Sequence, residues 1–223
     1  MSKICIFDLD GTLTDPALGI TKSYQKALAA FGIDEELPNL TRFIGPPLRG
    51  VFADVYGFSA EETERAVTVF REYFATTGLY ENEVYPGVME MLQRLREVDI
   101  TMAVATSKVK DYSQRILEHF QLAQYFAFVS GDAMDGSLTK NGKQEIIRLA
   151  LSALDPERKM TTVMIGDREH DILGAKQNGL ASIGATWGYG SRAELAAAGA
   201  DYLVDTPAEL VELVLTPSPP QPH

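Results

Sequence analysis

The chain has 223 residues, of which 45% are hydrophobic and 23% charged, a composition typical of a globular protein with one sizeable domain or a domain with a smaller insertion. The net charge of −11 opposes non-specific binding to nucleic acid and to anionic membranes. The single cysteine, Cys5, rules out an internal disulfide, and the sequence contains neither a membrane-spanning stretch nor a signal-peptide pattern. We therefore expect a cytoplasmic protein without a nucleic-acid or membrane partner.

The first strong pattern is an apolar run, residues 4–7, that leads into Asp8-Leu-Asp10-Gly11. Side chains alternate along a strand, so Asp8 and Asp10 should lie on the same side where the strand ends, and Gly11 allows the chain to turn there. Two adjacent carboxylates repel each other, and the pKa of one rises unless a cation neutralises them. The pattern predicts a metal site, an acid/base pair or both; a solvent-exposed Asp-Gly turn is the simpler alternative.

The segment that follows, residues 16–82, carries helical patterns at 19–31 and 60–76 and no convincing buried strand. We interpret it as a helical cap domain inserted into a core domain made of residues 1–15 and 83–215. Residues 216–223 are rich in proline and are expected to form a disordered tail.

In the remaining chain, short apolar runs alternate with amphipathic segments of helical length. The predicted strands, including the first, are residues 4–7, 100–105, 126–130, 162–165, 181–185 and 202–204. The predicted helices of the core are residues 88–97, 112–120, 143–154, 171–178 and 208–215. This alternation predicts an α/β fold with a doubly wound, mostly parallel sheet.

Polar residues follow several of these strands, and ligands of open α/β sheets bind beyond the carboxyl ends of the strands. Thr106 and Ser107 offer hydroxyl and backbone N–H groups at the end of the second strand. Asp167 and Asp171 add two carboxylates after the fourth strand, and Lys143 stands at the start of a helix. We expect these groups to meet Asp8 and Asp10 at one edge of the sheet. Ser107 could bind an anion through its backbone N–H, cap the next helix, or do both.

Taken together, these segments resemble the haloacid dehalogenase superfamily over nearly the whole chain, residues 4–215. The resemblance rests on four motifs in the family's order: Asp8-Leu-Asp-Gly-Thr-Leu-Thr-Asp15, Thr106, Lys143 and Gly166-Asp-Arg-Glu-His-Asp171. Lys140 is a rival for the lysine motif, but the acidic and apolar residues after Lys143 are more similar to the family pattern. Residues 85–87 and 187–192 resemble the phosphoglycolate phosphatase-like branch, which has a small helical (C1-type) cap.

The resemblance implies a phosphatase that works through an aspartyl phosphate. Asp8 would attack phosphorus, and Asp10 would protonate the leaving oxygen and then deprotonate the attacking water. Mg²⁺ is the expected cofactor, held by Asp8, the backbone carbonyl of Asp10 and Asp167. Asp171 would support the site without binding the metal directly.

The phosphate-binding groups implied by the resemblance are Thr106, Ser107 and Lys143, which would hold the oxygens of the transferring phosphoryl group. The substrate would be a small phosphate ester, with phosphoglycolate first, and Arg42 and Arg49 in the cap would read its carboxylate. A 5′-nucleotidase or pyrophosphatase is the main alternative. A sugar phosphomutase and a non-catalytic binding protein are further alternatives, and we expect a monomer or a homodimer.

Overall fold

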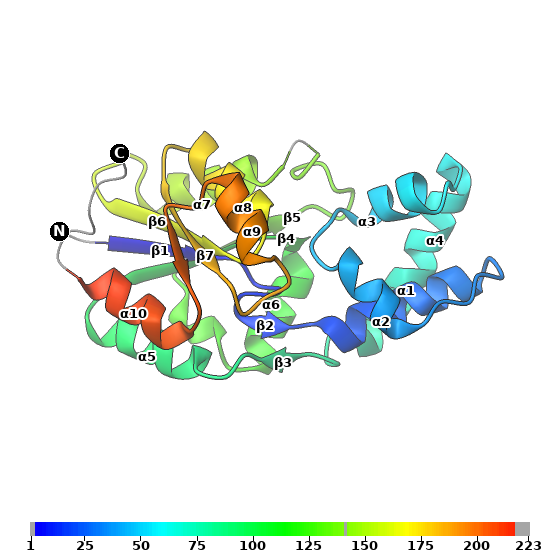
Figure 1. The fold of residues 1–223 in the computed structure, drawn as a ribbon, viewed down its shortest axis with the longest axis horizontal. Helices are drawn as coiled ribbons and strands as arrows, with labels where there is room; N and C mark the ends of the chain where they lie inside the picture. The colour runs from blue at the N-terminus through cyan, green and yellow to red at the C-terminus, as the bar shows by residue number, and fades with distance from the viewer. Residues whose placement is uncertain (1–2, 141, 217–223) are drawn as a thin grey trace. The chain divides into compact units, whose positions relative to one another are not determined.

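The computed structural model describes residues 3–140 and 142–216, and the chain divides into two compact units. Unit 1 comprises Met1–Thr14 and Val84–His223, and unit 2 comprises Asp15–Glu83. The chain passes between the units twice, at β2 (Thr14–Asp15) and β3 (Glu83–Val84), which pair as a two-stranded sheet (Figure 1). Within the proposed tail, residues 217–223 lie outside the described residues.

Unit 1 is built on a six-stranded parallel sheet in which β1 lies between β4 and β6 (Figure 1). In spatial order the strands are β5 (Phe128–Asp132), β4 (Thr101–Val109), β1 (Lys3–Phe7), β6 (Thr161–Gly166), β7 (Ala181–Ala185) and β8 (Tyr202–Val204). The order steps away from β1 in both directions, so the sheet is doubly wound and β1 ends at a topological switch point. The predicted α/β fold class is confirmed.

Helices cover both faces of this sheet, as parallel β–α–β connections require. They are α5 (Val88–Glu97), α6 (Lys110–His119), α7 (Gln144–Leu154), α8 (Glu169–Gln177), α9 (Arg192–Ala198) and α10 (Pro207–Leu215), with a 3-10 turn, η4 (Ala123–Tyr125). In Figure 1, α5 and α10 lie together below the sheet, and α7, α8 and α9 lie above it.

The core of unit 1 follows from side-chain alternation along β1. Ile4 and Ile6 face the α7 side, where they pack with Ile146, Ile147 and neighbouring apolar residues, all fully buried. Each such aliphatic side chain contributes roughly 1.5–3 kcal/mol when removed from water. The same alternation continues to Asp8, so burial of β1 fixes where the first acidic side chain stands.

Unit 2 is helical, as its sequence pattern predicts. Its elements are α1 (Ala17–Ala29), α2 (Leu37–Leu40), α3 (Leu48–Gly50) and α4 (Ala60–Tyr73), a 3-10 turn η1 (Thr41–Phe43), and π-helical turns η2 (Val51–Val55) and η3 (Phe74–Gly78). Tyr24 on α1 is the centre of its core, with ring centroids 4.9–5.6 Å from those of Phe43, Phe52 and Phe70. A capping box at Ser59 begins α4.

Several element boundaries differ from the predicted ones. β4 continues to Val109, beyond its predicted end at residue 105, and a register shift in its pairing with β5 follows Thr106. β5 begins two residues later than predicted, because Phe126 still closes the η4 turn by donating to the carbonyl of Ala123. Helix α9 was not predicted, although Ser191 caps it by accepting a hydrogen bond from the backbone of Glu194.

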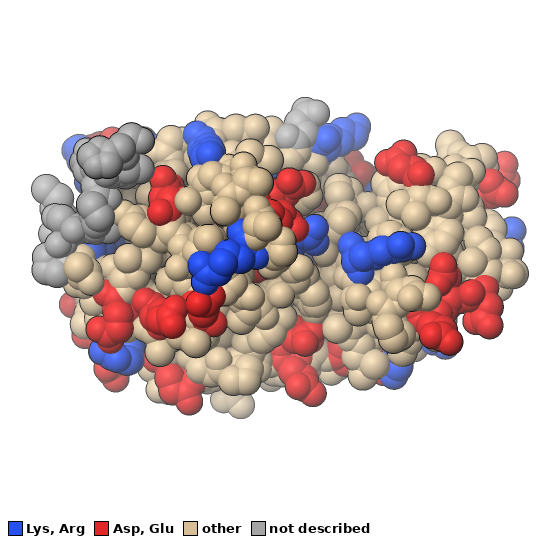
Figure 2. Space-filling model, viewed as in Figure 1, with Lys and Arg blue, Asp and Glu red and all other residues tan. Residues whose placement is uncertain are grey.

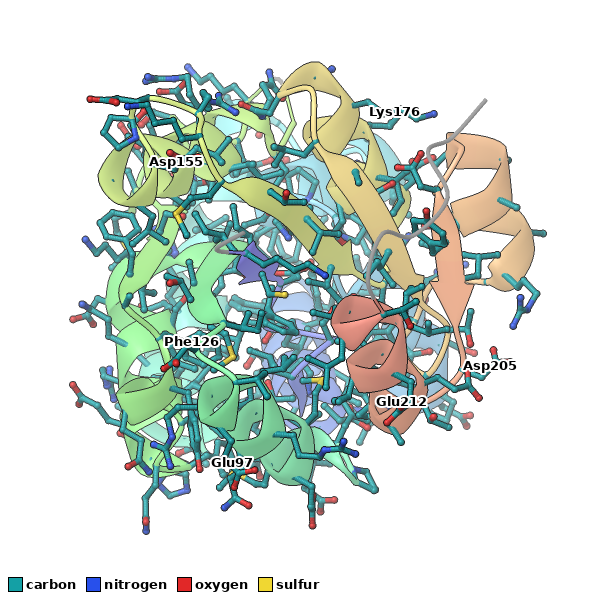
Figure 3. The ribbon with its side chains drawn as sticks, turned by 90° about the vertical axis from the view of Figure 1, so that its left-hand side faces the viewer. Glu97, Phe126, Asp155, Lys176, Asp205 and Glu212 are labelled. Atoms are coloured by element: carbon teal, nitrogen blue, oxygen red, sulfur yellow. The ribbon has the colours of Figure 1, made fainter. Side chains whose placement is uncertain are left out.

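The end of the sheet where β1 begins carries connections with a structural role. Figure 3 looks at this end and shows Asp155 after α7. Both carboxylate oxygens of Asp155 accept backbone N–H groups, from Lys159 at 2.9 Å and from Met160 at 2.8 Å. The buried carboxylate therefore satisfies the turn that leads into β6.

Acidic side chains dominate part of the surface of unit 1. Figure 2 shows them gathered over α10, where Glu209 and Glu212 are exposed. No helix among the described residues is long and apolar enough to cross a membrane.

Candidate active site

The site is formed at the carboxyl end of β1, where Asp8 is held by its neighbours on both sides. The Asp8 backbone N–H donates to the carbonyl of Ile165 at 2.8 Å, which extends the pairing of β1 with β6 by one residue. Its side chain is buried, and Oδ1 accepts the backbone N–H of Leu9 at 2.7 Å. Asp8 is thus fixed at the switch point of the sheet, with Oδ2 turned to the other site residues.

Lys143 provides the cation that faces Asp8. It stands at the N-cap of α7, and its buried Nζ lies 2.7 Å from Oδ2 of Asp8 and 2.5 Å from Oδ1 of Asp171. Burial lowers the pKa of Lys143, but Asp171 and Asp8 outweigh it and raise the pKa above its usual value. Lys140 is exposed, so the geometry favours Lys143 as the lysine of the site.

Asp167 is fully buried directly after β6, and its two oxygens have different partners. Oδ1 accepts the hydroxyl of Thr12 at 3.1 Å, and Oδ2 accepts the backbone N–H of Tyr189 at 2.9 Å. Burial, reinforced by the negative charges of Asp171 and Asp8, raises the pKa of Asp167 to about 8. Burial also raises the pKa of Asp171, to about 6, against the opposing effect of Lys143.

These carboxylates fit a divalent cation. Carboxylate oxygens of Asp8, Asp167 and Asp171 lie within 4.8 Å of one another. Among the described residues, the ion pairs of these carboxylates are those of Asp8 and Asp171 with Lys143, so the buried group carries excess negative charge when all three are ionised. Mg²⁺ prefers hard oxygen ligands, and its positive charge would compensate this excess negative charge.

Asp10 carries the second carboxylate of the acidic strand end, and it faces a different lysine. Lys108 Nζ lies 2.7 Å from Asp10 Oδ2, whereas Asp10 Oδ1 is buried and has no hydrogen-bond partner among the described residues. Burial raises the pKa of Asp10, and Lys108 opposes that rise. Gly11, with φ of +82°, turns the chain immediately afterwards, and a Cβ there would lie 2.2 Å from Asp167 Oδ2.

Thr106 and Ser107 follow the regular part of β4. Thr106 is buried, and its Oγ1 accepts the backbone N–H of Lys108 at 3.3 Å. Ser107 does not cap the following helix, because α6 begins at Lys110 with Val109 at its N-cap and no side-chain cap. The capping alternative for Ser107 is therefore wrong, and the anion-binding alternative stays a prediction.

The loop after β7 closes around Asp167. Trp187 Nε1 donates to the carbonyl of Thr12 at 3.0 Å, which joins this loop to the turn after Asp8. Gly188 allows a close approach, since a Cβ would lie 2.2 Å from the carbonyl oxygen of Gly11 and 2.4 Å from Cβ of Asp167. The loop thereby fixes the position of a carboxylate that is far away in sequence.

The two cap arginines have partners inside unit 2. Arg49 binds Glu64 through two hydrogen bonds, Nε to Oε1 at 2.5 Å and Nη2 to Oε2 at 2.9 Å. The guanidinium carbon of Arg42 lies 4.7 Å from the ring centroid of Phe43. The guanidinium of Arg49 therefore already binds a carboxylate of its own unit in the bidentate way in which it would bind a substrate carboxylate.

Lys108 and Thr12 are site residues to which the sequence interpretation gave no role. Period-two alternation in an extended chain places Lys108 on the same side as Thr106, which is the signal that was available. Thr12 is within the acidic motif, but its partner Asp167 follows 155 residues later. His170, between the two acidic residues of the fourth motif, lies in the first turn of α8 and is half-buried.

Comparison with known proteins gives a consistent family. The model of the haloacid dehalogenase-like hydrolases matches residues 5–185. A 5′-nucleotidase from Pseudomonas aeruginosa is 47% identical over 195 residues, 86% of each chain. The tyrosine-protein kinase PtkA of Mycobacterium tuberculosis is 37% identical over 84% of this chain, which spans 63% of the kinase. A phosphoglycolate phosphatase from Aquifex aeolicus is 28% identical over 95% of this chain and 96% of its own.

A solved structure agrees with these matches. A crystal structure described as that of a predicted phosphatase from Clostridium acetobutylicum superposes with a TM-score of 0.89 at 43% identity, covering 96% of this chain and 99% of the other. The chain therefore belongs to the haloacid dehalogenase-like hydrolase family, and the resemblance seen in its motifs is confirmed. It is an enzyme of that family, a phosphatase.

Proposed function

We propose that the protein is a Mg²⁺-dependent phosphomonoester hydrolase that forms an aspartyl phosphate on Asp8. The observation that carries the proposal is the buried group of Asp8, Lys143, Asp167 and Asp171 at the switch point of the sheet, with Asp10 two residues from Asp8. A carboxylate can serve as the nucleophile that forms an aspartyl phosphate, and an ammonium and a bound cation beside it would neutralise the charge of the transferring phosphoryl group.

The reaction divides into two steps. In the first, the Asp8 carboxylate attacks phosphorus, the bond to the leaving oxygen breaks, and Asp10 gives that oxygen a proton. In the second, water attacks the phosphorus of the aspartyl phosphate, Asp10 takes the proton from the water, and the bond from phosphorus to Asp8 breaks. Asp8 is thereby regenerated and inorganic phosphate is released.

The remaining residues bind and position the transferring group. Lys143 would hold a phosphoryl oxygen while Asp171 keeps its ammonium beside Asp8, and Thr106 and the backbone of Ser107 would hold the other oxygens. Mg²⁺, held by Asp8, the carbonyl of Asp10 and Asp167, would supply charge neutralisation for the phosphoryl group.

Of the two substrate classes that its relatives' names suggest, similarity ranks nucleoside 5′-monophosphates first. The relative named 5′-nucleotidase is 47% identical, against 28% for the phosphoglycolate phosphatase. The bidentate pairing of Arg49 with Glu64 also weakens its case as a reader of a substrate carboxylate. Phosphoglycolate remains the second candidate because a relative that aligns over 95% of this chain and 96% of its own length is named phosphoglycolate phosphatase.

The test is phosphate release by the purified protein with Mg²⁺ from nucleoside 5′-monophosphates, phosphoglycolate, pyrophosphate and sugar phosphates, with Asp8→Asn as the blank. We expect turnover of nucleoside monophosphates that Asp8→Asn abolishes, and phosphate trapped on Asp8 in Asp10→Asn after an acid quench. Preferential release from phosphoglycolate would keep the mechanism and reverse the ranking. Full turnover by Asp8→Asn would overturn the covalent mechanism.

A further inference from the structure

Lys108 forms a buried ion pair with Asp10, and the reaction proposed above assigns no role to Lys108. Its Nζ lies 2.7 Å from Oδ2 of Asp10, and the two side chains are only 7% and 14% exposed. Burial of a lysine costs free energy unless its charge is paired and hydrogen-bonded. A pair this close to the reacting groups is therefore more than a surface contact.

The course of β4 explains why Lys108 reaches Asp10. The strand runs to Val109, and it brings Lys108 to the end of β1, where Nζ meets Asp10 Oδ2. The hydroxyl of Thr106 accepts the Lys108 backbone N–H at 3.3 Å, and pairing with β5 shifts register just after Thr106. This irregular strand end aims Lys108 at the acidic end of the neighbouring strand β1.

The two oxygens of Asp10 are in different situations. Oδ2 accepts from Lys108, whereas Oδ1 is buried and has no hydrogen-bond partner among the described residues. A buried acceptor without a donor is destabilising. A ligand that brings a hydroxyl or a water molecule to Oδ1 would satisfy it.

We propose that Lys108 is a positioning residue for Asp10: it anchors the carboxylate through Oδ2 and leaves Oδ1 to exchange the proton with the leaving oxygen and with the attacking water. This inference rests on the proposed function, because it assigns the oxygens of the residue that acts as acid and base there. Without the anchor, the carboxylate can rotate, and Oδ1 then no longer points at the leaving oxygen or the attacking water. Small misplacements of a reacting group lower the rate strongly.

If Lys108 acts through Asp10, its effect on kcat/KM depends on the leaving group. A leaving group that departs without a proton does not need Asp10 in the first step, whereas a poor leaving group does. The value of kcat/KM reports only the steps up to formation of the aspartyl phosphate. Phenyl phosphate and 4-nitrophenyl phosphate have nearly the same shape and differ in this need, so they form a matched pair of probes.

The experiment measures kcat/KM for both aryl esters and for adenosine 5′-monophosphate in the wild type, Lys108→Met, Lys108→Arg and the control Lys110→Met. Lys110 is exposed, and its Nζ lies 5.7 Å from the ring centroid of Phe128. We expect Lys108→Met to lower kcat/KM for phenyl phosphate and adenosine monophosphate by about 10- to 100-fold, a part of the roughly 10²–10⁴-fold that acid–base catalysis supplies. The 4-nitrophenyl ester should lose less than about 3-fold, Lys108→Arg should recover part of the loss, and Lys110→Met should match the wild type.

A double-mutant cycle tests whether Lys108 acts through Asp10. In an Asp10→Asn background, Lys108→Met should lower kcat/KM for phenyl phosphate little further, because the group that it positions is already gone. Equal losses on all three esters, or full additivity with Asp10→Asn, would overturn the inference and indicate a role in binding phosphate or in folding. Absence of wild-type turnover on every ester would instead overturn the proposed function.

Discussion

In the proposed function a proton and a cation would compete for Asp167, because burial and two neighbouring carboxylates raise the pKa of this group to about 8. The unfolded chain releases this proton near the ordinary value of 3.8, so between these values the metal-free folded state binds more protons than the unfolded state. The contribution of Asp167 to the stability of the metal-free protein is therefore present below about pH 4 and is lost as the pH rises toward 8. A bound cation reverses this, since it needs the ionised carboxylate.

The first prediction concerns metal affinity. We expect the Kd for Mg²⁺, measured by isothermal titration calorimetry, to fall by about tenfold per pH unit between pH 6 and 7.5 and to level off above pH 8, because one proton leaves Asp167 for each metal bound. In Asp167→Asn the affinity should be much lower and this pH dependence absent. A Kd that does not change between pH 6 and 8 would show that Asp167 is not a ligand.

The second prediction separates the two lysines of the loop that leads to α7. Lys143→Ala should lower kcat by at least about 10²-fold, the usual cost of removing one donor to the transferring oxygens, whereas Lys140→Ala should stay within about 2-fold because an exposed side chain has little to lose. Loss of Lys143 also leaves Asp8 and Asp171 without their cation, which destabilises a buried pair by about 3–5 kcal/mol. Both variants are therefore assayed at a temperature where circular dichroism shows them folded. A larger loss in Lys140→Ala would assign the motif to Lys140.

At the scale of elements, the loop between β7 and α9 determines the geometry of the acidic site. It contributes the backbone N–H of Tyr189 to Asp167 and the indole of Trp187 to the turn after Asp8. On α9, Glu194 forms a salt bridge with Arg168 Nε at 2.8 Å and accepts the backbone N–H of Glu169 at 3.0 Å. The start of α8 is thereby tied to α9.

The third prediction follows from the space at Gly188. Gly188→Ala places a Cβ against the backbone oxygen of Gly11 and against Asp167, so the loop or the carboxylate must move. We expect at least a tenfold loss of kcat/KM with weaker Mg²⁺ binding, since small displacements of a catalytic group are costly, and a changed fluorescence of Trp187, the only tryptophan. Gly50→Ala, where the nearest atom is 3.4 Å away, is the control and should behave as the wild type. Unchanged kinetics in Gly188→Ala would mean that the loop adapts without disturbing Asp167.

Local sequence signals predicted most elements because each of them follows one period. The helix Val88–Glu97 and the strands Ala181–Ala185 and Tyr202–Val204 have the predicted bounds. The predicted end of β4 was wrong. The polar residues after Thr106 suggested that the strand ends there, but Val109 pairs with Asp132 and keeps the chain extended. That pairing is a tertiary contact and has no local signature.

At the scale of the molecule, each of the two units has its own core. The aromatic cluster around Tyr24 belongs to residues of unit 2, and the proposed metal ligands belong to unit 1. Stability of unit 2 and metal binding by unit 1 should therefore respond to different substitutions.

The fourth prediction tests this separation. Phe52 is fully buried beside Tyr24 and Phe58, and Phe52→Ala should destabilise unit 2 by about 3–5 kcal/mol. We expect limited proteolysis to cut first within residues 15–83, while Mg²⁺ affinity stays near that of the wild type. Val55→Ala, at a side chain that is 54% exposed, should change stability by less than about 0.5 kcal/mol. Loss of metal binding in parallel with unit 2 would contradict independent cores.

The sequence by itself determined the fold class, the acidic strand end and the family, because alternation, apolar runs and motif spacing are local properties of the chain. It also singled out Lys143, Asp167 and Thr106 as candidates for the site. Only the tertiary structure decided which groups face each other: Lys143 against Asp8 and Asp171, and Lys108 against Asp10. The reason is physical, since strand order and register bring together residues that are far apart in the sequence, and no local pattern records which strands become neighbours.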